Sequence, residues 1–243
     1  DELIPSLFGM FNLYLKARYD VAKAHVPAAQ QGQKALDLGC GDGVMTAELS
    51  CAGYQSFGLD GVPIAIEFAQ KKIKEKKMRA EFKVGSVYET AYPDSEFDLV
   101  TTLDVIEHLE DTDRFLKEII RVSKPGARVL IGTPIRITEK PLDRYHIHEY
   151  FSQEFEEFLS RYFEVEKIIK THSAGWFSFF CFRMTFLGRS LTPGRSFMNL
   201  VYRLSGRNFF MDEKSFLPTY QLAVCSVPKN HKFPSAALSQ KFV

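Results

Sequence analysis

Short apolar runs alternate with amphipathic stretches along most of this chain. Strands are predicted where the runs are short and continuous, and helices where apolar residues recur every three or four positions. The strand-like runs lie at residues 35–38, 57–60, 80–84, 97–103, 125–131, 163–171 and 219–227, and the helical spacing lies at residues 6–26, 63–73 and 111–122. Because strands and helices alternate, we predict an α/β, doubly wound fold with a mostly parallel sheet.

A glycine-rich turn, Asp37-Leu38-Gly39-Cys40-Gly41-Asp42-Gly43, directly follows the first predicted strand. Glycine allows positive φ and lets a ligand approach the main chain where a Cβ would collide. The helix that follows directs free N–H groups at the same place. Since ligands of open α/β sheets bind beyond the carboxyl ends of the strands, the turn predicts the floor of a cofactor pocket.

The residues of this turn distinguish between cofactors. A dinucleotide fold calls for Gly-x-Gly-x-x-Gly, whereas here the third glycine comes one residue early. Asp37 and Asp42 would repel a pyrophosphate, so a cationic ligand fits better. Asp60 ends the second strand, where a carboxylate can accept hydrogen bonds from both hydroxyls of a ribose. The alternative is that the glycines merely shape a tight turn.

Four segments in this order resemble the class I S-adenosylmethionine-dependent methyltransferases of the small-molecule, ubiquinone-biosynthesis-like branch. The first motif is Asp37-x-Gly-x-Gly-x-Gly, Asp60 is similar to the ribose-binding acid, and residues 97–100 and 125–131 are similar to the fourth and fifth segments. The resemblance implies a Rossmann-like, seven-stranded sheet with S-adenosyl-L-methionine as cofactor and S-adenosyl-L-homocysteine as product.

The resemblance also implies which residues contact the cofactor. The helix over residues 6–26 is expected to lie across the pocket as a lid, where Arg18 would meet the methionine carboxylate; the alternative is a solvated arginine. The family often carries an acid for the adenine amino group where this chain has Ser86, so that contact falls to the hydroxyl, to the Val87 amide or to water. The expected set is Arg18, Asp37, Gly39, Cys40, Gly41, Asp60, Gly61, Ser86, Val87 and Leu103.

Three histidines are candidates for catalysis. His108 follows Glu107 beyond the fourth strand, in the Glu-His pair common in small-molecule members of the resembling family; both residues have turn or loop stabilisation as the alternative. His146 and His148 follow the fifth strand, and their spacing in an extended segment would put both on one side. Either titrates near the working pH and can serve as a general base. Orientation, substrate contact or plain structure are the alternatives, and His148 fits the structural role better.

A metal site at these histidines, with Asp143 or Glu149 helping, is a further alternative. Three convergent ligands cannot be demonstrated from the sequence, so we predict no metal. Methyl transfer is an in-line displacement at a sulfonium methyl. Aligning the two reactants is worth about 7 to 11 kcal/mol, and a positioned base contributes typically about 10² to 10⁴ in rate.

A long insert separates the last two predicted strands, where the resembling fold has a short hairpin. From Lys167 to Met211 there is no Asp or Glu, whereas arginines and aromatic residues are frequent. This composition predicts a cap suited to an anionic acceptor with an apolar body, or to a membrane surface. Alternatively, the aromatics form the insert's own core and the arginines are solvated. The expected acceptor contacts are Tyr14, Tyr145, Trp176 and Arg183.

Four parts are predicted along the chain. They are an N-terminal lid helix (1–30), a methyltransferase core (31–172 plus 218–228), a basic aromatic insert (173–217) broken into short helices by glycines and prolines, and a loosely ordered tail (229–243).

Composition narrows the function classes. The 243 residues are 45% hydrophobic, which suits one large α/β domain, and a net charge of +1 argues against a nucleic-acid binder. The 4 cysteines form no Cys-x-x-Cys pair, so neither a zinc site nor a disulfide framework is indicated and a reducing cytoplasm is expected. No apolar run approaches the roughly 18 residues of a membrane span, although peripheral membrane contact stays open.

The leading hypothesis is therefore a cytoplasmic enzyme, monomer or homodimer, that moves a methyl group from S-adenosylmethionine to an oxygen of a small-molecule, sugar or lipid-linked acceptor. Methylation of nitrogen or carbon is an alternative. An RNA methyltransferase is disfavoured because residues 103–106 lack an Asn/Asp-Pro-Pro-Tyr-type motif. A non-catalytic module that binds the same cofactor is the rival from a different class, and the intact first motif and the histidine-bearing loop argue against it.

Overall fold

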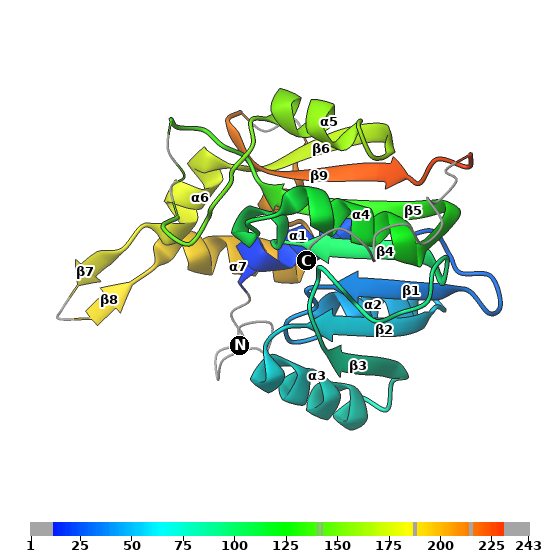
Figure 1. Ribbon diagram of the computed structural model, residues 1–243. Coiled ribbons are helices and arrows are strands. Elements are labelled where there is room, and N and C mark those ends of the chain that lie inside the picture. Colours follow the sequence, from blue (N-terminus) through cyan, green and yellow to red (C-terminus); the bar gives the residue numbers. More distant parts are fainter. Residues whose placement is uncertain (1–11, 140, 142, 187–188, 214–215, 231–243) are drawn as a thin grey trace.

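A computed structural model describes residues 12–139, 141, 143–186, 189–213 and 216–230 of the chain. Its main sheet has seven strands in the order β3-β2-β1-β4-β5-β9-β6 (Figure 1). The strands are β1 (Lys34–Leu38), β2 (Gln55–Asp60), β3 (Ala80–Val84), β4 (Phe97–Leu103), β5 (Ser123–Pro134), β6 (Glu164–Ser173) and β9 (Pro218–Ser226). Neighbouring strands are parallel except at β9, which runs antiparallel to both β5 and β6. The predicted doubly wound, mostly parallel sheet is confirmed.

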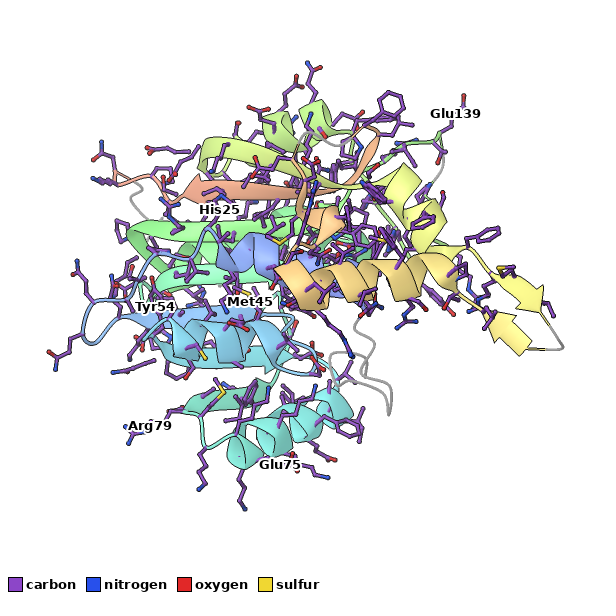
Figure 2. The ribbon with its side chains drawn as sticks, turned by 180° about the vertical axis from the view of Figure 1, so that it is seen from behind. His25, Met45, Tyr54, Glu75, Arg79 and Glu139 are labelled. Carbon is purple, nitrogen blue, oxygen red and sulfur yellow. The ribbon has the colours of Figure 1, made fainter. Side chains whose placement is uncertain are left out.

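Helices cover both faces of this sheet, as the alternating pattern predicted. They are α1 (Leu13–Lys23), α2 (Val44–Cys51), α3 (Pro63–Glu75), α4 (Thr112–Val122) and α5 (Ser152–Leu159), with a 3₁₀ turn η1 (Ile106–His108) after β4. In β1, Leu36 and Leu38 are buried in the cluster that contains α4 and α5, while Ala35 is buried with α1 and α2. Met45 of α2 belongs to the second cluster (Figure 2). Successive side chains of a strand point to opposite faces, so a continuous apolar run serves both layers.

Three predicted boundaries were wrong. Strand β5 begins at Ser123, before the turn expected at Pro125-Gly126; that turn is a bulge within the strand, with Gly126 at φ 78°. Ser152 does not cap α5 but begins it, and the Glu154 carboxylate accepts a hydrogen bond from the Phe151 amide at 3.1 Å. The first helix ends at Lys23 rather than at residue 26, and its predicted beginning at residues 6–11 lies outside the described residues.

The insert between β6 and β9 emerges at the carboxyl edge of the parallel strands, because Ser173 pairs with Pro218 and Pro134 with Tyr220. It consists of α6 (Ala174–Cys181), β7 (Met184–Phe186), β8 (Arg189–Leu191), α7 (Pro193–Ser205) and the 3₁₀ turn η2 (Phe209–Met211). The β7–β8 hairpin, which the sequence did not predict, projects away from the main sheet (Figure 1). A Cβ on Gly194 would lie 1.9 Å from the Phe179 carbonyl oxygen, so this glycine allows α7 to approach α6 closely.

The insert does not pack on itself alone. Phe180, Met198 and Phe210 form a buried cluster together with Leu13 and Ala17 of α1. The expectation that the insert's aromatics form a core is therefore correct in part, because the first helix completes that core. Helix α1 is consequently fixed between the insert and the sheet.

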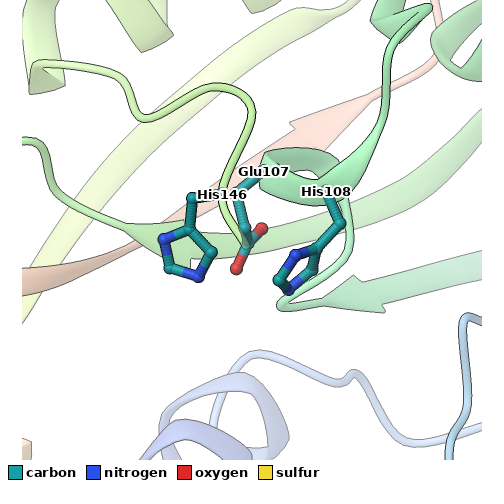
Figure 3. Close-up of side chains that lie close together, drawn as sticks. All are labelled: Glu107, His108 and His146. Atoms are coloured by element: carbon teal, nitrogen blue, oxygen red, sulfur yellow. The ribbon is translucent and has the colours of Figure 1, made fainter. Parts of the chain in front are cut away.

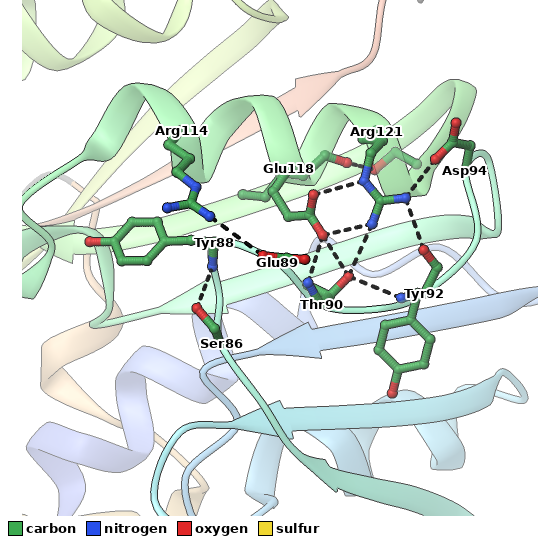
Figure 4. Close-up of polar contacts among 11 residues, drawn as sticks. Ser86, Tyr88, Glu89, Thr90, Tyr92, Asp94, Arg114, Glu118 and Arg121 are labelled. Carbon is green, nitrogen blue, oxygen red and sulfur yellow. Dashed lines mark hydrogen bonds and ion pairs between the residues drawn. The ribbon is translucent and has the colours of Figure 1, made fainter. Parts of the chain in front are cut away.

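A polar network fixes the segment that joins β3 to β4. The Glu118 carboxylate accepts hydrogen bonds from the Thr90 amide and hydroxyl, each at 2.7 Å, and from Arg121 Nε at 2.8 Å (Figure 4). Arg121 also donates to the Tyr92 carbonyl at 2.9 Å and pairs with Asp94. Burial opposes ionisation of Glu118, but the hydrogen bonds from Arg121 and Thr90 outweigh it and lower its pKa. The network holds the segment that carries Ser86 and Val87.

Within the described part of the chain, none of the helices is both long and apolar enough to cross a membrane. All four cysteines are free thiols, two of them buried and two exposed.

Candidate active site

A cavity of about 510 Å³ lies beyond the carboxyl ends of β1, β2 and β4; we call it the first cavity. Eight of the ten residues predicted to contact a cofactor line it: Asp37, Gly39, Cys40, Gly41, Asp60, Gly61, Val87 and Leu103. The other two, Arg18 and Ser86, are not in its lining. Ser86 is exposed, and its hydroxyl accepts a hydrogen bond from the Tyr88 amide at 3.2 Å.

The glycines of the turn serve different purposes. Gly39 has φ 77°, and a Cβ there would lie 2.3 Å from the Val105 side chain, so this glycine allows the chain after β4 to pack against the turn. Gly41 has φ 50° and nothing within 4 Å of an added Cβ, so its main chain faces open space. A ligand in the first cavity can therefore approach the backbone at Gly41 without a steric barrier.

Asp60 links the turn to the end of β2. One carboxylate oxygen accepts a hydrogen bond from the Gly41 amide and the other from the Val62 amide, both at 2.8 Å. Each oxygen has a second lone pair, which leaves the carboxylate able to accept from hydroxyl groups in the cavity. Asp60 thus shapes the glycine turn in addition to presenting its charge there.

Asp37 is buried beneath the turn. Its carboxylate accepts hydrogen bonds from the hydroxyls of Thr46 at 2.7 Å and Thr101 at 3.0 Å, which tie β1 to α2 and β4. Burial raises the pKa of Asp37 to about 6, against the opposing effect of these hydrogen bonds. Asp37 stabilises the floor of the cavity, a role that the motif by itself did not reveal.

Arg18 lies beside the first cavity and forms an ion pair with Asp104 at 2.7 Å. Its guanidinium lies 4.9 Å from the Tyr14 ring and 5.0 Å from the Tyr220 ring. Although burial opposes its charge, the neighbouring Asp104 raises the pKa of Arg18. The next residue, Tyr19, lines the first cavity instead. Helical spacing alone does not show which side of α1 faces the ligand.

A second cavity, of about 640 Å³, lies on the other side of Arg18 and is bounded by α1, α6 and the loop after β5. Tyr14 and Tyr145, predicted as acceptor contacts, both line it, as does His146. Trp176 and Arg183 do not: the Trp176 ring packs on Phe209 with centroids 4.6 Å apart, and Arg183 is exposed. Phe177, which the sequence did not single out for this role, lines the cavity and contacts the Tyr14 ring at 4.8 Å.

Two histidines lie side by side between the two cavities, at a place that we call the junction. His108, from η1, lines the first cavity, and His146 lines the second; their ring centroids are 4.9 Å apart. Nδ1 of His146 lies 2.6 Å from a carboxylate oxygen of the buried Glu149, and Nδ1 of His108 lies 3.0 Å from the Tyr145 carbonyl oxygen. The Glu107 carboxylate lies next to both rings (Figure 3).

Glu107 is only 1% exposed. One carboxylate oxygen accepts a hydrogen bond from the Thr133 hydroxyl at 3.0 Å, while the other, Oε1, is buried without a hydrogen-bond partner among the residues that the structure describes. Its backbone carbonyl accepts from the amides of Ile147 at 2.7 Å and His148 at 3.1 Å, so Glu107 holds the neighbouring loop as the sequence allowed. Burial, aided by the charge of Asp104, raises the pKa of Glu107 to about 8.

His148 belongs to neither cavity lining; it is exposed and lies 6.4 Å from the Tyr150 ring. The prediction that His146 and His148 share one side was wrong, because the segment is not extended. The amides of the successive residues Ile147 and His148 both donate to the Glu107 carbonyl, at 2.7 and 3.1 Å, and the chain bends at Ile147, which breaks the alternation of side chains.

Residues 36–131 match the family profile described as a methyltransferase domain. A protein of Mycolicibacterium smegmatis named "Probable S-adenosylmethionine-dependent methyltransferase" is 31% identical over 169 residues, which cover 67% of this chain and 64% of that one. The mitochondrial ubiquinone biosynthesis O-methyltransferase of Schizosaccharomyces pombe is 34% identical over 105 residues, 42% of this chain and 38% of the relative.

The chain therefore spans less than two thirds of the length of these relatives. Among solved structures, a TehB-like S-adenosylmethionine-dependent methyltransferase of Corynebacterium glutamicum superposes with a TM-score of 0.55, at 21% identity, over 87% of each chain. At that identity the likeness concerns the fold alone.

Proposed function

We propose that this chain, a class I S-adenosylmethionine-dependent methyltransferase whose residues 36–131 match the profile of a methyltransferase domain, transfers a methyl group to a hydroxyl of a small or lipid-linked acceptor. The observation that carries the proposal is the contact between His108 of the first cavity and His146 of the second, whose rings are 4.9 Å apart. One cavity has the motif residues of the cofactor site and the other has the apolar wall that an acceptor requires. O-methylation is favoured over N- or C-methylation because the junction offers imidazoles that can accept a hydroxyl proton.

The first cavity fits an adenosyl ligand with a positive charge. Asp37, Asp60 and Asp104 all line it, so its walls are acidic and would repel a pyrophosphate. Asp60 suits a ribose, and the open space at Gly41 admits the ligand to the backbone. S-adenosylmethionine, when bound, supplies a methyl group on a positively charged sulfur.

In the proposed reaction, the acceptor O–H loses its proton and the oxygen forms a bond to the methyl carbon as the bond between that carbon and sulfur breaks. The products are the methyl ether, neutral S-adenosylhomocysteine and one proton. Glu149 holds Nδ1 of His146, so that Nε2 carries the lone pair that faces the junction. We assign the removal of the proton to the junction of His108 and His146, and we give His148 no catalytic role.

The second cavity favours an acceptor with an apolar or aromatic body. Tyr14, Tyr145 and Phe177 provide aromatic surface that suits such a body. The charged lining residues are of both signs, Arg18 and Arg144 beside Asp143 and Glu149. We propose that residues 173–217 act as the cap of this cavity. Free thiols at all four cysteines support a reducing, cytoplasmic setting as part of the same proposal.

The outer surface of the insert supports contact with lipid. Phe182, Leu200, Leu204 and Phe216 are 54%, 55%, 79% and 82% exposed, and the segment 167–211 carries no acid. Exposed apolar side chains among arginines favour an anionic membrane surface, from which a lipid-linked acceptor would enter. Co-sedimentation with anionic vesicles is expected and should fall in Leu200→Ser/Leu204→Ser. Equal sedimentation of that variant and the wild type would remove the lipid surface from the proposal.

The function itself is tested in two steps. Calorimetric titration should show micromolar binding of S-adenosylmethionine and S-adenosylhomocysteine and none of NAD. Acceptors with phenol, sugar or lipid-linked hydroxyls are then screened for formation of S-adenosylhomocysteine. For an acceptor that turns over, His146→Ala should reduce kcat by about 10² to 10⁴ while cofactor affinity changes little. Binding of the cofactor without turnover of any acceptor class would favour the non-catalytic module.

A further inference from the structure

The junction between the cavities contains the ligand set of a metal site. One oxygen of Glu107 and one ring nitrogen from each of His108 and His146 all lie within 4.8 Å of one another (Figure 3). The three side chains come from η1 and from the loop after β5, so the fold, and not one contiguous motif, brings them together. Glu107 is 1% exposed, His146 is partly buried and His108 is exposed. The set is therefore buried on the side of Glu107 and accessible to solvent on the side of His108.

A buried oxygen in this set has no other role in the structure. Glu107 Oε1 is buried and has no hydrogen-bond partner among the described residues, although its neighbour Oε2 is held by Thr133. Leaving a buried polar atom unpaired is costly. The Asp104 carboxylate is close enough to add unfavourable charge, and Arg18 pairs with only one of its oxygens. A cation at the junction would satisfy Oε1 and reduce this repulsion.

Both histidines are oriented as metal ligands usually are. Nδ1 of His146 bonds to the Glu149 carboxylate, and Nδ1 of His108 bonds to the Tyr145 carbonyl, two groups that only accept hydrogen bonds. Nδ1 is therefore the protonated nitrogen in each neutral ring, and Nε2 carries the free lone pair. Ligating histidines almost always donate their other N–H to a carboxylate or a backbone carbonyl in this way. Glu149 and the Tyr145 carbonyl are the outer partners that the site requires.

We propose that Glu107, His108 and His146 bind one divalent first-row cation, such as Mn²⁺ or Zn²⁺, and that this cation coordinates the acceptor hydroxyl. The proposal rests on the methyltransferase function proposed above. Two imidazoles and one carboxylate leave coordination positions open, as in catalytic sites with three protein ligands.

The cation would act on the acceptor and not on the cofactor. A hydroxyl oxygen bound to a divalent cation loses its proton more easily, because the positive charge stabilises the alkoxide or phenolate. The proton passes to solvent, and the bound oxygen then forms the bond to the methyl carbon while that carbon separates from sulfur. When the cation is bound, the two imidazoles act as its ligands and not as bases. The cation lowers the pKa of the acceptor hydroxyl, so a histidine base is no longer required.

The sequence analysis expected no metal because it considered only the histidines of the loop, with Asp143 or Glu149 as helpers. The structure instead brings the Glu107-His108 pair to His146 and leaves His148 outside. Glu149 has a supporting role as the partner of His146 Nδ1.

The test is a titration of the purified, EDTA-treated full chain with Mn²⁺. Binding is monitored as the loss of the electron paramagnetic resonance signal of free Mn²⁺. The wild type is expected to bind one Mn²⁺. His108→Gln and His146→Gln should each weaken binding at least tenfold, and Glu149→Gln should weaken it about 10- to 100-fold as an outer partner. His148→Gln is the matched control, since it changes a neighbouring histidine outside the set, and its Mn²⁺ affinity should equal that of the wild type.

Two results would overturn the proposal: no Mn²⁺ binding by the folded wild type, or a Mn²⁺ affinity in both His108→Gln and His146→Gln that is unchanged from that of the wild type. His108→Gln is decisive because the side chain is exposed, so its loss does not threaten folding. Calorimetry with S-adenosylmethionine on the same EDTA-treated sample separates the two proposals. Cofactor binding without Mn²⁺ binding refutes the metal site and leaves the proposed methyltransferase function intact. Mn²⁺ binding without cofactor binding refutes the proposed methyltransferase function and leaves only a metal site.

Discussion

His172 should make the folded state sensitive to acid. It lies at the end of β6, fully buried, with Nε2 donating to the Tyr14 carbonyl of α1 at 2.9 Å and Nδ1 accepting from the Thr171 hydroxyl at 2.7 Å. Its ring stacks on Phe210 of the insert. Burial lowers the pKa of His172 to about 3, and the charge of Arg18 acts in the same direction.

The sign follows from proton binding. Between pH 6.5 and about pH 3 the unfolded chain carries a proton on this imidazole and the folded chain does not, so the free energy of unfolding falls as the pH falls through 6.5. Between pH 8 and pH 5 the loss is about 2 kcal/mol, from roughly 1.5 pH units at about 1.36 kcal/mol each. Any folded-state pKa below about 4 gives the same loss, so the prediction depends on the burial of the ring and not on the last unit of its pKa.

The variant His172→Gln removes the titrating group, and His25→Gln is the control because it removes a histidine that is only partly buried. Urea unfolding at pH 8 and pH 5 is followed by fluorescence of Trp176, the single tryptophan, and by circular dichroism. Asp37 and Glu107 titrate in all three proteins, so their contributions cancel in the comparison. The wild type and His25→Gln should each lose about 2 kcal/mol more than His172→Gln. An equal loss in His172→Gln would refute the reasoning.

Three further predictions concern the first cavity and its support. Asp60→Ala should weaken S-adenosylmethionine binding at least tenfold in calorimetry while the protein stays folded; unchanged affinity would exclude the ribose role. Gly43→Ala would place a Cβ 2.8 Å from Phe82 at φ 78°, so the free energy of unfolding should fall by about 1 to 3 kcal/mol, and no change in urea would contradict this packing. Glu118→Ala leaves the Thr90 amide without its partner and removes the hydrogen bonds of Arg121 to this carboxylate, so it should cost about 1 to 3 kcal/mol. Glu89→Ala is the control, because the Glu89 side chain is 80% exposed, and it should change stability by less than about 0.5 kcal/mol.

Most of the fold was predictable because its signals are local. Strands β3 and β4 begin and end where their apolar runs do, and the glycines of the first turn adopt positive φ as that turn required. The miss at β5 has a specific cause: Pro125-Gly126 has the composition of a turn, but pairing with β4 and β9 continues through it as a bulge. Tertiary pairing there overrides the local preference.

Most lining residues of the first cavity were likewise predictable from the sequence, since a parallel sheet places the carboxyl ends of its strands at one edge. Arg18 was the exception. Its residue type indicated an ion pair, but whether the partner is a ligand carboxylate or Asp104 depends on how α1 packs. The position of α1 is fixed by the insert, whose elements follow α1 in the chain by more than 150 residues. No local pattern near residue 18 contains that information.

The sequence by itself therefore determined the order of strands and helices, the glycine turn with its ribose-type acid, and the existence of a basic aromatic insert. Tertiary structure alone decided that Glu107 is buried with one oxygen that has no partner among the described residues, that His108 contacts His146, and that His148 lies outside the set. The physical reason is that hydrophobic periodicity and turn chemistry act over a few residues, whereas a ligand set depends on the distance and burial of side chains far apart in the chain.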